Sequence, residues 1–121
     1  AAYVEVIHTD SGIFGNGIGI PIGHSDFFVN GGSNQPGCLT NSCCHRRSWE
    51  LFAASLVPQF IHLGYRCDSM TQVNLNTCRG LTLPLVVVLP RIGRLSTATY
   101  HPLIIRTRAN IHLFFYSNFN N

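Results

Sequence analysis

The N-terminal part of the chain alternates between apolar stretches and stretches rich in glycine and polar residues. Residues 3–8 carry β-branched and aromatic side chains around one charge and predict a strand, and residues 26–29 predict a second, shorter one. Residues 11–23 hold five glycines and Pro21, so we expect a long loop between the two strands. Turn-forming residues at 30–32 and 35–37 follow the second strand.

A helical period replaces this pattern at residues 42–57. Four side chains recur at spacings of four, three and four and share one helical face, namely His45, Trp49, Phe52 and Leu56. Asn41 or Ser42 is the expected N-cap, and Pro58 is the expected end of the helix. We interpret the three apolar members of this face as core residues.

The chain changes composition after Cys78. Residues 59–78 look like a loop, whereas residues 79–121 are rich in β-forming side chains. All five acidic residues precede Cys78, while residues 79–121 hold five arginines and no acid. We therefore divide the chain into residues 1–78 and an apolar, acid-free segment, 79–121, of uncertain origin.

The overall composition excludes several classes of protein. A length of 121 residues suits one small domain, and a charged content of 11% is less than half the usual value of about 25%. The formal charge of +3 is small and all basic residues are arginines, so we expect no nucleic-acid partner. The longest apolar run, residues 81–89, is about half a membrane span and contains Pro84, so we expect no transmembrane segment.

The five cysteines favour disulfides over a metal site. No two of them are separated by just two residues, and the paired spacing of a zinc site is absent from the sequence. Disulfides indicate an oxidising compartment, so we expect a secreted, extracellular protein. The first residues lack the basic start and apolar run of a signal peptide, which predicts a mature chain or one without its front end.

Six motifs occur in order between Val4 and Cys78, namely Val6-Ile7-His8-Thr9-Asp10, Gly23-His24-Ser25-Asp26-Phe27-Phe28, Asn30-Gly31-Gly32, Gln35-Pro36-Gly37-Cys38, Cys43-Cys44-His45-Arg46-Arg47-Ser48 and Gly64-Tyr65-Arg66-Cys67-Asp68-Ser69. Together they strongly resemble the pancreatic-lipase family, especially its insect phospholipase A1 and lipase branch. The resemblance covers about two-thirds of the chain and implies the C-terminal part of a lipase catalytic domain. It implies an α/β-hydrolase fold, incomplete on its own, and a Ser-Asp-His triad that cleaves lipid esters.

The resemblance makes His45 the catalytic base, because it stands in the family motif C-x-H-x-R-S. A serine hydroxyl needs a nearby imidazole that removes its proton and returns it to the leaving group. A histidine in the first turn of a helix lies near the positive end of the helix dipole, which helps to keep it neutral. The alternative is a partly buried structural histidine.

The other two triad members are expected upstream of Ala1, because the family order is serine, aspartate, histidine. Ser25 lies in an incomplete echo of G-x-S-x-G that aligns with a different family motif, and it does not fit the nucleophile. We interpret Asp10 and Asp26 as structural. The chain alone is therefore expected to be inactive, and the upstream coding sequence, searched for G-x-S-x-G and a following D-P, would test this.

The resemblance also implies two disulfides. Cys38 and Cys43 match the cysteines that bracket the family's lid, and the short flap between them resembles the phospholipase A1 branch, although a plain loop staple is the alternative. Cys67 and Cys78 match a second family disulfide around a surface loop. Cys44 is either free or a competitor for Cys38, which leaves the 38–43 pairing open.

The expected function is that of a fragment of a carboxylic-ester hydrolase, either phospholipase A1 or triacylglycerol lipase. Its partner is a lipid or phospholipid at a membrane or lipid surface, and neither a metal nor an organic cofactor is implied. His8 and His24 are interpreted as hydrogen-bonding braces of loops, and Arg47 as a residue that holds the helix. The rival hypotheses are a non-catalytic, yolk-type lipid-binding member of the family and a truncated gene product without activity.

Overall fold

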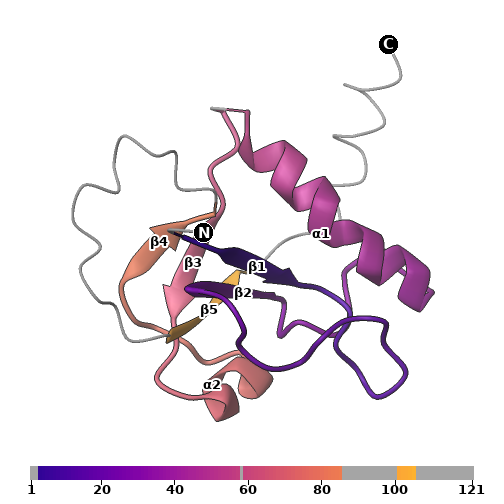
Figure 1. Cartoon of the computed structure of the whole chain (residues 1–121), viewed down its shortest axis with the longest axis horizontal. Helices are drawn as coiled ribbons and strands as arrows, with labels where there is room; N and C mark the ends of the chain where they lie inside the picture. Colours follow the sequence, from indigo (N-terminus) through magenta and orange to yellow (C-terminus); the bar gives the residue numbers. More distant parts are fainter. Residues whose placement is uncertain (1–2, 58, 86–100, 106–121) are drawn as a thin grey trace.

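The structure, a computed structural model, describes residues 3–57, 59–85 and 101–105, the last by their backbone alone. Five strands form one sheet in the order β1-β2-β5-β3-β4, and two helices pack against it (Figure 1). Strands β1, β2 and β5 run parallel, whereas β3 is antiparallel to β5 and to β4. The elements are β1 (Glu5–His8), β2 (Ser25–Val29), α1 (Asn41–Ser55), β3 (Leu63–Arg66), α2 (Met70–Leu75), β4 (Thr82–Pro84) and β5 (His101–Ile105).

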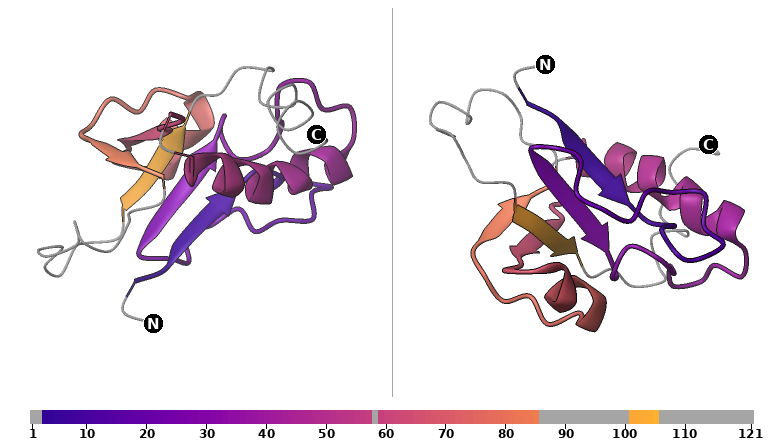
Figure 2. Two further views of the ribbon diagram at one scale, coloured as in Figure 1. Left: turned by 90° about the horizontal axis from the view of Figure 1, so that it is seen from above. Right: turned by 60° about the horizontal axis from the view of Figure 1, so that its bottom comes forward.

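Strand β2 forms the centre of the core, because all five of its residues are buried. Its alternate side chains point to opposite faces of the sheet. Phe27 and Val29 pack with Leu51 of α1, whereas Phe28 packs with Val73 of α2. The two helices therefore cover opposite faces, and the views in Figure 2 show the strands between them.

Helix α1 begins one residue earlier than the candidate caps suggest. Thr40 is the N-cap, and its hydroxyl accepts a hydrogen bond from the backbone N–H of Cys43, so the prediction of Asn41 or Ser42 was wrong. The helix ends at Ser55, ahead of Pro58. Proline follows the end of the helix as predicted, but the helix ends two residues before the predicted last residue, Val57.

The buried face of α1 also differs from the predicted one. Trp49, Phe52 and Leu56 are exposed, so their interpretation as core residues was wrong. The buried positions are Cys44, Arg47, Glu50, Leu51 and Ala54. Arg47 and Glu50 are tolerated there because Arg47 Nη1 donates to Glu50 Oε2 at 2.8 Å, an ion pair that supports the expected role of Arg47.

Residues 59–78 are more regular than expected. They contain β3 and α2, and the disulfide between Cys67 and Cys78 joins the end of β3 to the segment after α2. Ser69 caps α2 by accepting a hydrogen bond from the backbone N–H of Gln72. Each element is about one turn or one short strand long, which explains why no period was visible in the sequence.

The C-terminal segment contributes two strands to the same sheet. β4 pairs with β3, and β5 lies between β2 and β3. Residues 86–100 and 106–121, which hold most of the β-forming residues noted in the sequence, lie outside the described residues. None of the helices in the described part of the chain is long and apolar enough to cross a membrane.

Candidate active site

The carboxyl end of β1 carries a buried aspartate that organises the loop after it. Asp10 is 2% exposed, and its Oδ2 accepts hydrogen bonds from the backbone N–H and the side-chain amide of Asn16, at 2.9 and 3.1 Å. Its backbone carbonyl accepts a third bond from the N–H of Gly17 at 2.9 Å. The loop is thus wrapped around Asp10, and this supports the interpretation of Asp10 as a structural residue.

A buried glutamine ties the ends of the two neighbouring strands together. The amide nitrogen of Gln35 donates to the carbonyls of Thr9 and Val29, at 3.0 and 2.8 Å. The chain reaches Gln35 through a turn in which Gly31 and Gly32 have φ of 85° and 82°, where a side chain would be strained. A Cβ at Gly32 would also lie 2.8 Å from the ring of Phe28. This turn therefore fixes the place of Thr9 and Asp10.

His45 lies in the first turns of α1, opposite the end of β1. The hydroxyl of Thr9 donates to the backbone carbonyl of His45 at 3.4 Å and joins the helix to the strand end. His45 Nδ1 lies 4.0 Å from Asp10 Oδ2, an ion-pair distance that is too long for a hydrogen bond. The His45 side chain is 55% exposed. Its imidazole can therefore meet a reactant while one nitrogen faces a buried carboxylate.

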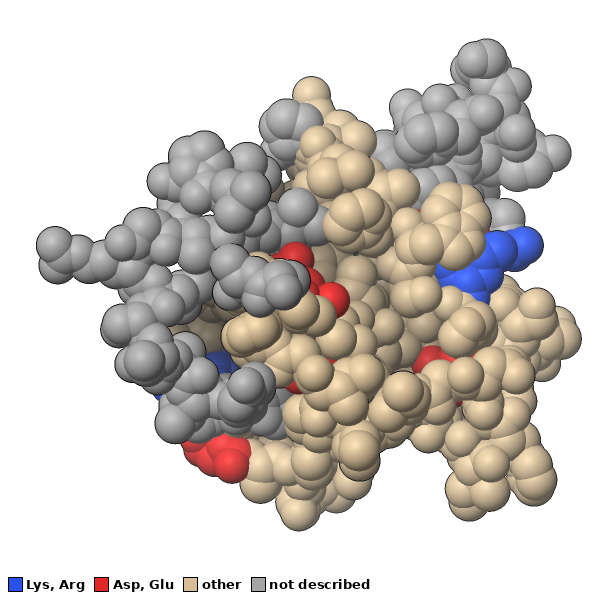
Figure 3. Space-filling model, in the orientation of Figure 1, with Lys and Arg blue, Asp and Glu red and all other residues tan. Residues whose placement is uncertain are grey.

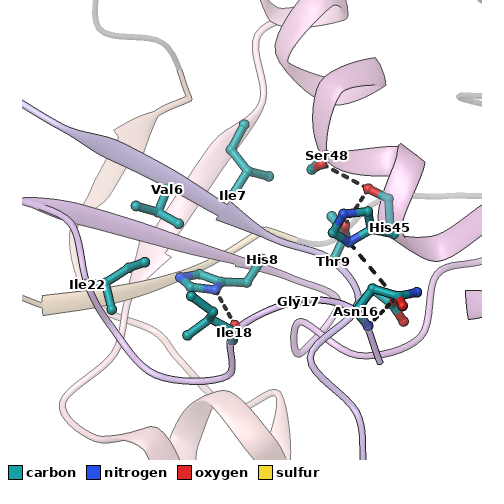
Figure 4. Close-up of a pocket in the computed structure, with 11 residues that line it drawn as sticks. Val6, Ile7, His8, Thr9, Asn16, Gly17, Ile18, Ile22, His45 and Ser48 are labelled. Atoms are coloured by element: carbon teal, nitrogen blue, oxygen red, sulfur yellow. Dashed lines mark hydrogen bonds and ion pairs between the residues drawn. The ribbon is translucent and has the colours of Figure 1, made fainter. Parts of the chain in front are cut away.

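A cavity of about 250 Å³ lies between the strand end, the loop and the helix. Figure 4 shows apolar side chains at one end of it and polar ones, including His45 and Asn16, at the other. An apolar cavity with a few convergent polar groups is the usual form of a small-molecule site. The apolar end is lined by Val6, Ile7, Ile18 and Ile22, and the polar end by Thr9, Asp10, Asn16, His45 and Ser48.

A second histidine in the cavity wall, His8, differs from His45 in its burial and in the contacts of its ring nitrogens. His8 is buried, its Nδ1 lies 2.7 Å from the carbonyl of Ile18, and its Nε2 lies 2.8 Å from Asp26 Oδ1. Its ring stacks on Phe28 with 4.1 Å between ring centroids. Asp26 also accepts from the backbone N–H groups of residues 22 and 23. His8 and Asp26 thus brace the loop. These contacts support the interpretation of His8 as a hydrogen-bonding brace and of Asp26 as a structural residue.

His24 also braces the loop, but through bonds to the backbone of Val4. Its Nδ1 accepts a hydrogen bond from the backbone N–H of Val4 at 3.0 Å, while the backbone N–H of His24 donates to the carbonyl of Val4 at 2.9 Å. These two bonds close the end of the loop against the residue before β1.

The described serines near the site are already engaged elsewhere. Ser25 is buried, and its Oγ accepts a hydrogen bond from the hydroxyl of Tyr3 at 2.9 Å. Burial raises the pKa of the Tyr3 phenol, so this group stays a donor. Ser48 Oγ donates to the backbone carbonyl of His45. Within residues 3–57 and 59–85, no serine hydroxyl is hydrogen-bonded to the His45 imidazole.

The described residues contain two disulfides, one next to the site and one in the core. Cys38 is bonded to Cys43 just before His45, and Cys67 is bonded to Cys78 beside Phe28. Cys44 is a free, buried cysteine on the inner face of α1. The two disulfides are the pairings that the family resemblance implied, including the 38–43 pairing that was left open.

Comparison with known proteins decides the family. The profile of the Lipase family matches residues 1–93. The chain belongs to the pancreatic-lipase family. This match extends past Cys78, where the recognisable motifs end.

Two groups of relatives in this family are similar to the chain. Phospholipase A1 member A from Homo sapiens is 37% identical over 101 residues, which cover 77% of this chain and 22% of the relative. The Bos taurus protein of the same name is 35% identical over the same lengths. Pancreatic lipase-related protein 2 from Cavia porcellus is 41% identical over 83 residues, 64% of this chain and 19% of the relative. The chain spans about a fifth of the length of these lipase relatives.

The sequence did not single out three residues that build the site. Thr9, Asn16 and Gln35 looked like ordinary strand-end, loop and turn residues. Thr9 is bonded to His45, Gln35 to Thr9 and Asn16 to Asp10, and these bonds join segments that are distant in the sequence. The only local signal was that Thr9 and Gln35 each fall inside a lipase motif.

Proposed function

We propose that the chain is the histidine-bearing part of a secreted carboxylic-ester hydrolase whose serine and aspartate lie in an upstream segment. The observation that carries this proposal is the position of His45. It lies half exposed at the mouth of a cavity with apolar walls, and its Nδ1 faces the buried Asp10 carboxylate. Family membership supports ester hydrolysis as the reaction.

In this mechanism His45 acts twice. Its Nε2 takes the proton of the serine hydroxyl as the serine oxygen bonds to the ester carbon, and the imidazolium then protonates the departing glycerol oxygen. A water molecule hydrolyses the acyl-serine by the same two proton transfers. The upstream aspartate would accept a hydrogen bond from Nδ1–H and so leave Nε2 free to accept a proton, as in other triads, while Asp10 stays 4.0 Å from Nδ1.

The fold supports the same assignment. In open α/β sheets, ligands bind beyond the carboxyl ends of parallel strands. Asp10 lies two residues after the end of β1, and the cavity is lined by β1, the loop that follows it and the start of α1. We infer that the mixed sheet is the C-terminal part of an α/β-hydrolase sheet, which the upstream segment would extend.

Phospholipase A1 ranks ahead of triacylglycerol lipase as the activity. The disulfide between Cys38 and Cys43 leaves only four residues for a flap, which is too short to cover an acyl pocket. An open site admits the head group of a phospholipid. Relatives named phospholipase A1 support this order, although relatives named pancreatic lipase-related protein share similar identity. Two disulfides support a secreted protein.

The activity can be tested with the longer protein that carries this segment. We expect it to release the acyl chain from the first position of phosphatidylcholine faster than it hydrolyses a triacylglycerol emulsion. Absence of turnover on both substrates would contradict the proposal. A faster rate on triacylglycerol would retain the hydrolase and reverse the order of substrates.

The division of the triad can be tested with the 121-residue chain. A fluorophosphonate, which modifies activated serines, should label the longer protein and leave the 121-residue chain unlabelled. Labelling of a serine in residues 1–121 that depends on His45 would show that the nucleophile lies in this chain.

A further inference from the structure

The ring of buried His8 faces a hydrogen-bond acceptor at each of its two nitrogens. Nδ1 lies 2.7 Å from the carbonyl oxygen of Ile18, and Nε2 lies 2.8 Å from Oδ1 of Asp26. A carbonyl oxygen and an ionised carboxylate can only accept, whereas a neutral imidazole has a single N–H to donate. Because a buried acceptor without a donor is costly, two contacts at these distances require two protons. His8 and Asp26 together therefore hold one proton more than a neutral histidine beside a carboxylate.

The extra proton belongs on His8 rather than on Asp26. Both carboxylate oxygens of Asp26 accept a backbone N–H, Oδ1 from Ile22 at 2.9 Å and Oδ2 from Gly23 at 3.0 Å. Bonds of this kind stabilise the ionised form of a carboxylate. The side chains of His8 and Asp26 are each 2% exposed, and a buried carboxylate needs a partner of opposite charge. An imidazolium at His8 meets this need and donates to both acceptors.

The other neighbours of His8 in the described part of the chain leave Asp26 as its anionic partner. Phe28 stacks on the ring, with 4.1 Å between ring centroids, and carries no charge. The other ionisable side chains that line the cavity are Asp10 and His45. The Asp10 carboxylate is bonded within its own loop, and it faces His45 rather than His8.

The pair of His8 and Asp26 fastens the loop that follows β1. His8 binds the carbonyl of Ile18, and Asp26 binds the N–H of Ile22. Both isoleucines line the apolar end of the cavity, and Figure 4 shows them next to the His8 ring. The loop forms no ion pair of its own, because residues 11–23 contain no Asp, Glu, Lys or Arg. In Figure 3 the projection at the lower right, where Figure 1 draws this loop, is accordingly free of red and blue.

We propose that His8 is a positioning residue that carries a proton on both ring nitrogens and so fixes Ile18 and Ile22 as the wall against which the acyl chain of the substrate packs. A neutral ring would keep its N–H on Nε2, toward charged Asp26, and would turn the lone pair of Nδ1 toward the Ile18 carbonyl. The loop would then be released at Ile18, and the wall would lose its fixed position. The role of the wall in substrate selection rests on the proposed function, whereas the two ring protons do not.

The two protons are tested in the 121-residue chain with isotope-labelled histidine nitrogens. Proton–nitrogen correlation spectra at about pH 7.5, where an exposed histidine is mostly neutral, show which ring nitrogens are protonated. We expect a proton on both nitrogens of His8. The variant His8→Gln removes these signals and so assigns them. One protonated and one bare nitrogen at His8 would overturn the proposal.

Two variants separate the bond to Ile18 from the bond to Asp26. An asparagine amide nitrogen takes the place of Nδ1 and a glutamine one that of Nε2, so His8→Asn keeps the donor to Ile18 and His8→Gln keeps the donor to Asp26. The N–H of Gly17, which donates to the carbonyl of Asp10, reports opening of the loop beside Ile18 through hydrogen exchange. We expect about tenfold faster exchange in His8→Gln, from one lost hydrogen bond, and less than about threefold in His8→Asn. Equal acceleration in both variants would mean general destabilisation and would overturn the anchoring role.

Substrate selection is tested in the longer protein with two soluble esters of para-nitrophenol, the acetate and the octanoate. Only the octanoate has a chain long enough to pack against Ile18 and Ile22. His8→Gln should lower the ratio of kcat/KM for the octanoate to kcat/KM for the acetate by about tenfold, and His8→Asn by less than about threefold. An unchanged ratio in His8→Gln would overturn the role of the wall. Absence of turnover in the parent protein would instead contradict the proposed function, and the spectra of the 121-residue chain would still decide whether His8 holds two protons.

Discussion

The two histidines that line the cavity have opposite surroundings. His8 is buried, with both ring nitrogens within hydrogen-bond distance of Ile18 and Asp26. His45 is half exposed, and its nearest charged partner, Asp10, lies at 4.0 Å. A histidine with both nitrogens engaged by protein atoms has none left for a substrate, whereas His45 keeps one for proton transfer. The comparison separates a structural histidine from a candidate base.

The two disulfides follow the same division. Cys67 and Cys78 are buried with Phe28, the ring on which His8 stacks. Cys38 and Cys43 are half-buried and close the turn just before His45. The region around His8 is thus closed and cross-linked in the core, while the region around His45 is cross-linked at the surface. Stability should depend mainly on the first region and chemistry on the second.

The largest effect on stability should come from removing one partner of the buried pair. His8→Ala removes the hydrogen bond between Nε2 and buried Asp26 and the ring that stacks on Phe28, and should lower the free energy of unfolding by about 3 to 5 kcal/mol. His45→Ala removes a half-exposed side chain and should change it by less than about 0.5 kcal/mol. Urea unfolding of both variants measures the difference, and equal losses would refute the comparison.

The two disulfides should differ less than the two histidines in their contributions to the free energy of unfolding. Replacing Cys67 and Cys78 by serine opens the longer loop and should cost about 3 kcal/mol, against about 2 kcal/mol for Cys38 and Cys43. The core position of the first pair adds to its cost. Urea midpoints of the two double variants test this order. A larger loss of stability for the Cys38–Cys43 pair would mean that the surface region around His45 contributes more to the free energy of unfolding than the core region around His8.

The smallest effect should come from a third histidine, His62, whose Nδ1 is buried without a hydrogen-bond partner among the described residues. Desolvation lowers the pKa of His62 below 6.5, although a backbone bond to Phe60 acts in the opposite direction. Between pH 6.5 and the lower folded pKa the unfolded chain therefore binds more protons than the folded one, so stability falls as the pH drops across this interval.

The test of His62 is the difference in urea midpoint between about pH 7.5 and about pH 5, a range that spans the ordinary histidine pKa. His62→Gln should reduce this difference, because glutamine does not titrate. An unchanged difference would show that other groups account for the acid sensitivity.

The sequence predicted the elements whose patterns are local. Strands β1 and β2 were predicted from residue composition, above all the β-branched and aromatic residues of 3–8, helix α1 from its side-chain period and the long loop from its glycines. Elements β3 and α2 were missed, because four and six residues are too few to show a period. The face of α1 was misassigned because its buried side includes the charged pair of Arg47 and Glu50, whereas the apolar stripe at Trp49 faces solvent.

The candidate site likewise combines residues that a local sequence pattern predicts with contacts that only the fold creates. The role of His45 stays a prediction from its contiguous motif, whereas the two disulfides that the family resemblance implied are confirmed, including the pairing of Cys38 with Cys43 that was left open. The approach of Asp10 to His45 and the bridge from Gln35 to the strand ends were not foreseen. These contacts depend on a parallel strand pair and a helix meeting at one edge, which no local pattern encodes.

The central claim is that His45 is the general base, and its most direct test is turnover on phosphatidylcholine by the longer protein. His45→Ala should reduce kcat by several orders of magnitude, as losses of triad residues do, while vesicle binding and Trp49 fluorescence stay unchanged. The matched variant is His24→Ala, which removes another histidine from outside the cavity lining and should keep most of the activity. A folded His45→Ala protein that retains a tenth or more of the parent turnover would contradict the account and place the base elsewhere.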